Sequence, residues 1–160
     1  MGLLTSSARK SEDPTVTGDN STVVSDERFE QLIAFLGSQL PAPVEQHEAN
    51  DGTLIFVGGA PAEVVVHLDE SSVAVSEYAE VRESINRVTP KPRRVGLLKW
   101  RRLPETQLMN AVSALIKGAR EARVARYRHC SICGKRNPPE ALSKDDVCRW
   151  CADRPRVVVH

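Results

Sequence analysis

Four cysteines in the last quarter of the chain have the spacing of a metal site. They are the only cysteines among the 160 residues, and they form two Cys-x2-Cys pairs, Cys130/Cys133 and Cys148/Cys151, with fourteen residues between the pairs. A Cys-x2-Cys turn places two thiolates about 2.3 Å from one shared metal ion, and two such turns complete a tetrahedron. The pattern therefore predicts one bound Zn²⁺ ion with these four ligands.

Other uses of the same four thiols stay open. Rubredoxin-like iron sites have this spacing but surround the metal with aromatic side chains, and Trp150 is the only aromatic residue after Cys130. A redox dithiol or two disulfides are further alternatives. His129 is expected to point away from the metal, as the immediate neighbour of a ligand. Four thiolates leave no open coordination position, so we expect a structural metal and no enzymatic activity.

The residues around the cysteines predict how each pair is held. Gly134 permits a positive φ after Cys133, which lets backbone N–H groups point at the sulfur atoms of a zinc knuckle. Ala152 follows the second pair, which favours a short helix there that ends before Pro155. The valines at 157–159 are typical of a closing strand.

The motifs His-Cys-Ser-x-Cys-Gly-Lys and Val-Cys-x-x-Cys, over residues 129–152, resemble treble-clef and zinc-ribbon modules. They are similar in particular to the small zinc-binding domain of the Clp-type bacterial unfoldase. In that family the zinc domain dimerises and recognises substrate and adaptor proteins. The resemblance implies the four metal ligands named above and favours a role in protein interaction.

The elements that must position this module indicate an α+β fold. A helix is predicted from Ser25 to Leu40, and Pro104 begins a long helix with an apolar stripe down to Tyr127. Apolar runs between the two helices predict a small antiparallel sheet with strands at 53–57, 64–68, 73–78 and 95–100. The expected organisation is a disordered tail at 1–24, an α+β domain at 25–128 and a treble-clef or zinc-ribbon module at 129–160.

Composition limits the class of protein. The chain has 41% hydrophobic residues, enough for one core, and no apolar run long enough to span a bilayer. The N-terminus lacks the order of residues of a secretory signal. We therefore expect a cytoplasmic protein without membrane contact, in a reducing compartment where thiolates bind metal.

Charge is distributed unevenly along the chain and bears on the partner. Residues 1–80 contain 14 acidic and 3 basic residues, whereas residues 81–160 contain 7 acidic and 19 basic ones. The two halves can neutralise each other within the fold, or the basic half can attract a partner. The expected binding residues beside the cysteines are Arg120, Arg123, Arg126, Lys135 and Arg136.

Two functions follow from this basic region. The first is a non-enzymatic adaptor that contacts a protein partner or a second copy of itself through the zinc module and the basic helix. The alternative is binding of DNA or RNA through phosphate contacts, to which a basic segment around Trp100 would add. We favour the first, because the sequence pI is about 7.7, no nucleic-acid recognition motif is present, and Trp100 is expected in the core.

Overall fold

The computed structural model describes residues 17–153, with side chains from Asp26 onward. The chain divides into two compact units, Met1–Gly37 and Ser38–His160. The first unit contains most of helix α1 (Thr17–Gln39). The predicted start of this helix at Ser25 is wrong, because no proline between Thr17 and Ser25 stops the helix from extending toward the N-terminus. Residues 1–16 of the predicted tail and the predicted strand at 157–159 lie outside the described residues.

The second unit is built on a five-stranded antiparallel sheet with the order β1-β2-β3-β4-β7. The strands are β1 (Val44–Glu48), β2 (Leu54–Gly58), β3 (Val64–Leu68), β4 (Val73–Glu77) and β7 (Arg93–Leu98). Strands β2 and β3 form the expected hairpin, with Phe56 opposite Val66. The prediction of a small antiparallel sheet in an α+β fold is confirmed, although the last strand ends at Leu98, two residues before Trp100.

Between the two long helices, three of the described strands were not predicted from the sequence. Strand β1 lies at the edge of the sheet, and four of its five residues are exposed, so it has no apolar alternation. Strands β5 (Glu80–Ser84) and β6 (Arg87–Pro90) form a separate two-stranded hairpin whose side chains are mostly exposed. Pro90 and Pro92 were interpreted as a linker, but Pro90 ends β6, a position that a strand outside a large sheet tolerates.

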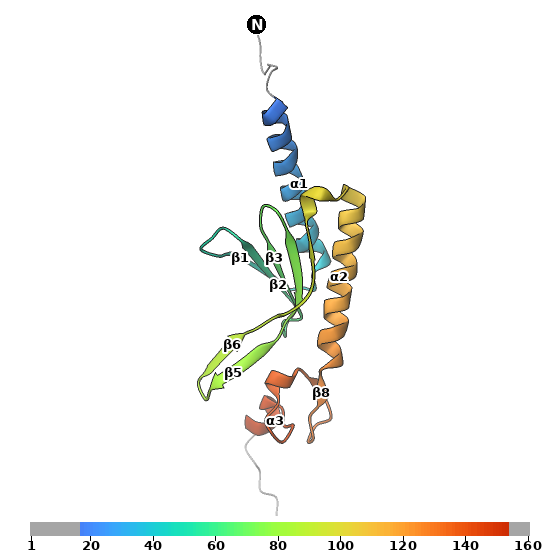
Figure 1. Cartoon of the computed structure of the whole chain (residues 1–160). Coiled ribbons are helices and arrows are strands. Elements are labelled where there is room, and N and C mark those ends of the chain that lie inside the picture. Colours follow the sequence, from blue (N-terminus) through green and yellow to red (C-terminus); the bar gives the residue numbers. More distant parts are fainter. Residues whose placement is uncertain (1–16, 154–160) are drawn as a thin grey trace, which may run out of the picture. The chain divides into compact units, whose positions relative to one another are not determined.

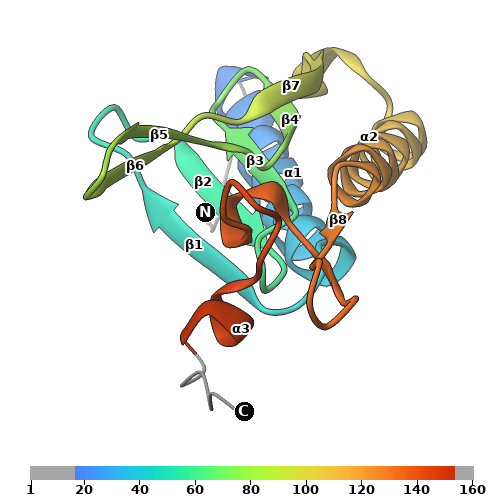
Figure 2. The ribbon, with the colours of Figure 1, turned by 90° about the horizontal axis from the view of Figure 1, so that it is seen from below.

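Helix α2 (Glu105–Ala125) packs on β3, β4 and β7, as Figure 2 shows from the end of the helix. Its buried residues recur every three or four positions: Leu108, Val112, Ile116, Ala119 and Arg123. Gly96 on β7 permits this close packing, because a Cβ atom there would lie 2.6 Å from Cδ2 of Leu115. Pro104 precedes the helix instead of entering it, and the helix ends at Ala125, before the predicted Tyr127.

Trp100 lies in the core, as expected, although it belongs to the short 3-10 helix η1 (Trp100–Arg102) that joins β7 to α2. Its indole Nε1–H donates a hydrogen bond of 2.9 Å to the backbone oxygen of Asp69. This bond fixes the turn between β3 and β4 to the start of α2.

We expect Trp100→Phe to lower the free energy of unfolding by about 1–3 kcal/mol, because the carbonyl of Asp69 loses its buried partner. Urea unfolding monitored by far-ultraviolet circular dichroism measures this. Trp150→Phe is the matched control, since Trp150 is 63% exposed, and its effect should stay within about 0.5 kcal/mol. Equal effects of the two substitutions would contradict the role of the hydrogen bond.

The described residues end in a small module of short elements. These are β8 (Arg128–His129), β9 (Arg136–Asn137), the 3-10 helix η2 (Pro139–Ala141) and α3 (Arg149–Asp153). Figure 1 shows the module at the C-terminal end of α2, at the same end of the sheet as the β5–β6 hairpin. All four cysteines lie in this module.

Candidate metal centre

The sulfur atoms of the four cysteines form one compact cluster. All of them lie within 4.8 Å of one another. The Sγ atoms of Cys130 and Cys151 are 3.8 Å apart, and those of Cys133 and Cys148 are 3.9 Å apart. A tetrahedron with metal–sulfur bonds of about 2.3 Å has edges of about 3.8 Å, so the cluster has the size of a four-thiolate metal site. No disulfide links these four cysteines.

The first pair sits on a β-hairpin that has the hydrogen bonds of a zinc knuckle. Strands β8 and β9 pair with His129 opposite Arg136, and the N–H of Cys130 donates to the carbonyl of Lys135 at 2.9 Å. Gly134 has a φ of 75° and donates its N–H to the carbonyl of Cys130, which confirms the predicted positive φ at this position.

Backbone N–H groups surround the sulfur of Cys130. The N–H groups of Cys133, Cys148 and Ile132 donate to this sulfur over 3.4–3.5 Å. These hydrogen bonds, the one from Cys133 first, lower the pKa of Cys130 to about 6. The fold therefore stabilises a thiolate at this position, which is the form that binds a metal.

The second pair stands at the start of helix α3, as predicted. Cys148 directly precedes the helix, Cys151 lies within it, and the N–H of Ala152 donates to the carbonyl of Cys148. Burial and the neighbouring thiols raise the pKa of Cys151 to about 12. Four thiolates repel one another at this distance, so a bound cation is the charge that would keep them together.

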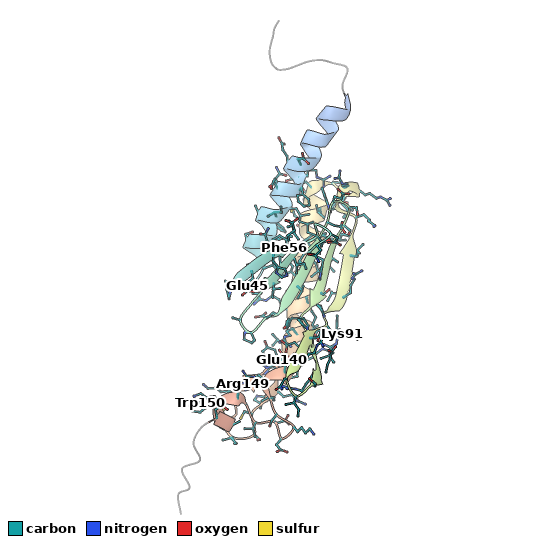
Figure 3. The ribbon with its side chains drawn as sticks, turned by 90° about the vertical axis from the view of Figure 1, so that its left-hand side faces the viewer. Glu45, Phe56, Lys91, Glu140, Arg149 and Trp150 are labelled. Carbon is teal, nitrogen blue, oxygen red and sulfur yellow. The ribbon has the colours of Figure 1, made fainter. Side chains whose placement is uncertain are left out.

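The surroundings of the cluster are apolar on the inside and exposed on the outside. Leu142 and Val147 pack against the buried cysteines. Cys133 is exposed, and Ile132 beside it is 63% exposed. Trp150 is equally exposed, and Figure 3 shows it at the outer end of the module. His129 is exposed on β8 and is not part of the cluster.

The module is attached to α2 by one partly buried ion pair and one exposed hydrogen bond. Arg123 on α2 is 2% exposed and forms an ion pair through two nitrogens with Glu140 of η2, which is labelled in Figure 3. Its Nε donates to the carbonyl of Ala62 at 3.0 Å. Arg136 of the knuckle donates to the carbonyl of Val124 at 2.8 Å. The cysteine module is thus held in one place relative to α2.

The structure distributes the five predicted binding residues over different environments. Arg123 is buried and bonded within the protein, so its guanidinium is not presented to an external phosphate. Arg120 pairs with Glu63 at 2.9 Å, and Arg126 pairs with Glu77 at 2.6 Å. Lys135 and Arg136 lie exposed on the knuckle. Acidic residues of the first 80 positions therefore neutralise part of the basic half within the fold.

Sequence reasoning did not group the charged residues that the fold brings together at the end of α2, although it placed Arg93 in the basic segment around Trp100. Arg82 and Arg93, from the hairpin and from β7, lie near Arg126, and the buried carboxylate of Glu77 pairs with both Arg93 and Arg126. Their separation along the chain gave no local signal. For Arg123 the sequence did contain a local signal, because its position continues the spacing of three and four residues along the buried stripe of α2.

The comparisons with known proteins return no match: no family model, no curated protein and no solved structure is similar to this chain at a significant level. Within residues 17–153, none of the helices combines the length and apolar character needed to cross a membrane. The function must therefore be argued from the site itself.

Proposed function

We propose that this chain is a non-enzymatic zinc protein and that the four cysteines hold one structural Zn²⁺ ion in a treble-clef arrangement. A knuckle that supplies the first ligand pair and a helix start that supplies the second are the two parts of such a module. The donor set supports zinc, because soft thiolate ligands in a tetrahedron select zinc or iron. Trp150 points outward, which leaves the cluster without the aromatic shell of a rubredoxin-like site.

The proposed role of the module is to present a surface to a partner protein. The observation that carries this proposal is a groove of about 660 Å³ on α2 beside the knuckle. Its apolar part includes Ile116 and Val124, and its basic part comes from Lys117, Arg120 and Arg136. Glu63 and Glu121 also line it, with Glu63 paired to Arg120. An acidic peptide segment with apolar side chains matches this lining.

The zinc ion contributes to this surface by fixing the knuckle. Arg136 follows Cys133 by three residues, forms part of the wall of the groove and donates a hydrogen bond to the carbonyl of Val124. Loss of the metal would release β9 and with it this wall. The same reasoning makes an enzymatic role unsupported, because a closed four-thiolate site has no position for a substrate or an activated water.

We expect acidic, leucine-containing peptides labelled with fluorescein to bind the zinc-loaded protein, and Lys117→Glu to weaken their binding at least tenfold, because the charge at the groove is reversed. Fluorescence anisotropy measures both. Lys99→Glu is the matched control, since Lys99 is an exposed lysine outside the groove. Equal binding by wild type and Lys117→Glu would exclude the groove as the peptide site.

The same titrations with generic duplex DNA and single-stranded RNA test the second candidate function. At about 50 and 200 mM salt, a nucleic-acid surface loses affinity steeply because counterions are released on binding. Internal pairing of Arg120, Arg123 and Arg126 with glutamates disfavours this function. Tight, salt-sensitive binding of nucleic acid without peptide binding would replace the protein-interaction proposal. Sedimentation velocity reports whether the partner is a second copy of the chain.

A further inference from the structure

A second, smaller cleft lies between the β5–β6 hairpin, the C-terminal part of α2 and the 3-10 helix η2. Its volume is about 260 Å³, and it does not share lining residues with the groove described above. Four arginines line it: Arg82 of β5, Arg93 of β7, Arg123 of α2, and Arg126, which directly follows α2. Such convergence of arginines from distant parts of a chain is typical of a site for an anion.

The charges at this cleft do not balance. Arg93 and Arg126 share the single carboxylate of Glu77, at 3.3 and 2.6 Å, and the Glu77 side chain is 4% exposed. One carboxylate cannot neutralise two guanidinium groups. Arg123 and Glu140 form a neutral pair, and Glu80 is the one further acidic residue of the lining to set against Arg82. The cleft therefore has a net excess of one positive charge.

The arginines also have unused hydrogen-bond donors. A guanidinium group has five N–H donors. Among the described residues, Arg93 and Arg126 each bond Glu77 through one nitrogen only, and both side chains are about half exposed. Arg82 donates through NH1 to the carbonyl of Ile85 on its own hairpin. Each of the three thus keeps at least two nitrogens available to a ligand in the cleft.

The rest of the lining is apolar. Val88 of β6, Pro139 of η2 and Leu142 after it stand beside the arginines. A volume of about 260 Å³ lies below the range of roughly 300–1,000 Å³ for drug-sized ligands, so the occupant is small. It has an anionic end for the guanidinium groups and a compact carbon skeleton for the apolar wall.

We propose that this cleft binds a small phosphate monoester, with the phosphate on Arg82, Arg93 and Arg126 and the carbon skeleton against Val88 and Leu142. A phosphate dianion offers three terminal oxygens, which match several forked donors better than one carboxylate does. The small volume of the cleft suits a free small molecule, because the backbone of a nucleic acid needs an extended stripe of charge. This inference is independent of the peptide groove and of the proposed partner.

Isothermal titration calorimetry of the full zinc-loaded chain tests the proposal with inorganic phosphate, the small monophosphate phenyl phosphate, and phenol. We expect the monophosphate to bind more tightly than inorganic phosphate, and phenol to give no binding heat. Arg82→Gln and Arg93→Gln should each weaken monophosphate binding about tenfold, the effect of losing one charge-assisted contact. Lys117→Gln is the control, because it removes a positive charge from the other groove.

Arg82→Gln separates a loss of binding from a loss of folding. The only hydrogen bond of Arg82 among the described residues is to Ile85, so its loss leaves the Glu77 and Glu140 pairs in place. No binding of phosphate or monophosphate at millimolar concentration would overturn the proposal. Unchanged affinity in both arginine variants, with normal circular dichroism spectra, would overturn it as well.

Discussion

Cys148→Ser is expected to abolish binding of the proposed zinc ion and to unfold residues 128–153 while the five-stranded sheet stays folded. The serine hydroxyl is a weak zinc ligand, and the Sγ atom of Cys148 lies within the cluster, 3.9 Å from that of Cys133, so the substitution removes one of the four sulfur ligands. Structural zinc contributes about 10–16 kcal/mol of apparent binding free energy, far more than the few short elements of the module contribute by packing. The sheet has its own core with α2.

Elemental analysis of the purified variant measures the zinc, and two-dimensional amide NMR spectra show which part of the chain unfolds. Lys144→Ser is the matched control, because it places a serine at an exposed position of the same module. A full equivalent of zinc in Cys148→Ser would exclude the four-thiolate site. One equivalent of iron in the wild-type protein would contradict zinc, and unfolding of the whole chain would show that the module belongs to the main core.

The elements that sequence reasoning predicted are those whose signal is local. The spacing of the cysteines brings two thiolates onto each turn, and the cluster then needs only that the two turns meet. The hairpin of β2 and β3 and the stripe of α2 follow from apolar periodicity over a few residues. Even Gly134 was identifiable, because the turn after a Cys-x2-Cys pair requires a positive φ there.

The elements that sequence reasoning missed depend on contacts between distant parts of the chain. Strand β1 exists because its backbone pairs with β2, and its exposed polar side chains carry no strand pattern. The hairpin of β5 and β6 likewise has little buried apolar surface. Nothing local in the sequence set Glu77 apart from other polar strand residues. It is nevertheless buried, and it pairs with Arg93 and Arg126, which follow it by 16 and 49 positions.

The same limitation explains the interpretation of Arg123 as part of an external binding face. Its charge placed it with the other basic residues of the helix, although its position continues the spacing of Val112, Ile116 and Ala119. An arginine on a buried stripe requires a buried partner, since an unpaired buried charge is very costly. Glu140 supplies that partner from the cysteine module, 17 residues further along the chain.

Arg123→Ala should therefore destabilise the protein by about 3–5 kcal/mol, the cost of leaving one member of a buried ion pair without the other. The substitution removes the two bonds to Glu140 and the bond to the carbonyl of Ala62. It also leaves a cavity beside Tyr78 and Tyr127, because the guanidinium group of Arg123 lies over both rings. Arg120→Ala is the matched control, one turn earlier on α2. Its pair with Glu63 is half exposed, and its loss should cost about 0–1 kcal/mol.

The pH dependence of stability gives an independent measure of this pair. Burial alone would raise the pKa of Glu140, but the hydrogen bonds from Arg123, a backbone hydrogen bond and the charges of Arg123 and Arg93 together outweigh it and hold the pKa below the ordinary value. A carboxyl whose pKa is lower in the folded state stabilises the protein above its unfolded pKa, and this stabilisation is lost as the pH falls through the folded value. Urea unfolding should thus show wild type more stable than Glu140→Gln at neutral pH, with the difference shrinking in acid. A pH-independent difference, or equal costs for Arg123→Ala and Arg120→Ala, would mean that packing alone holds the cysteine module on α2.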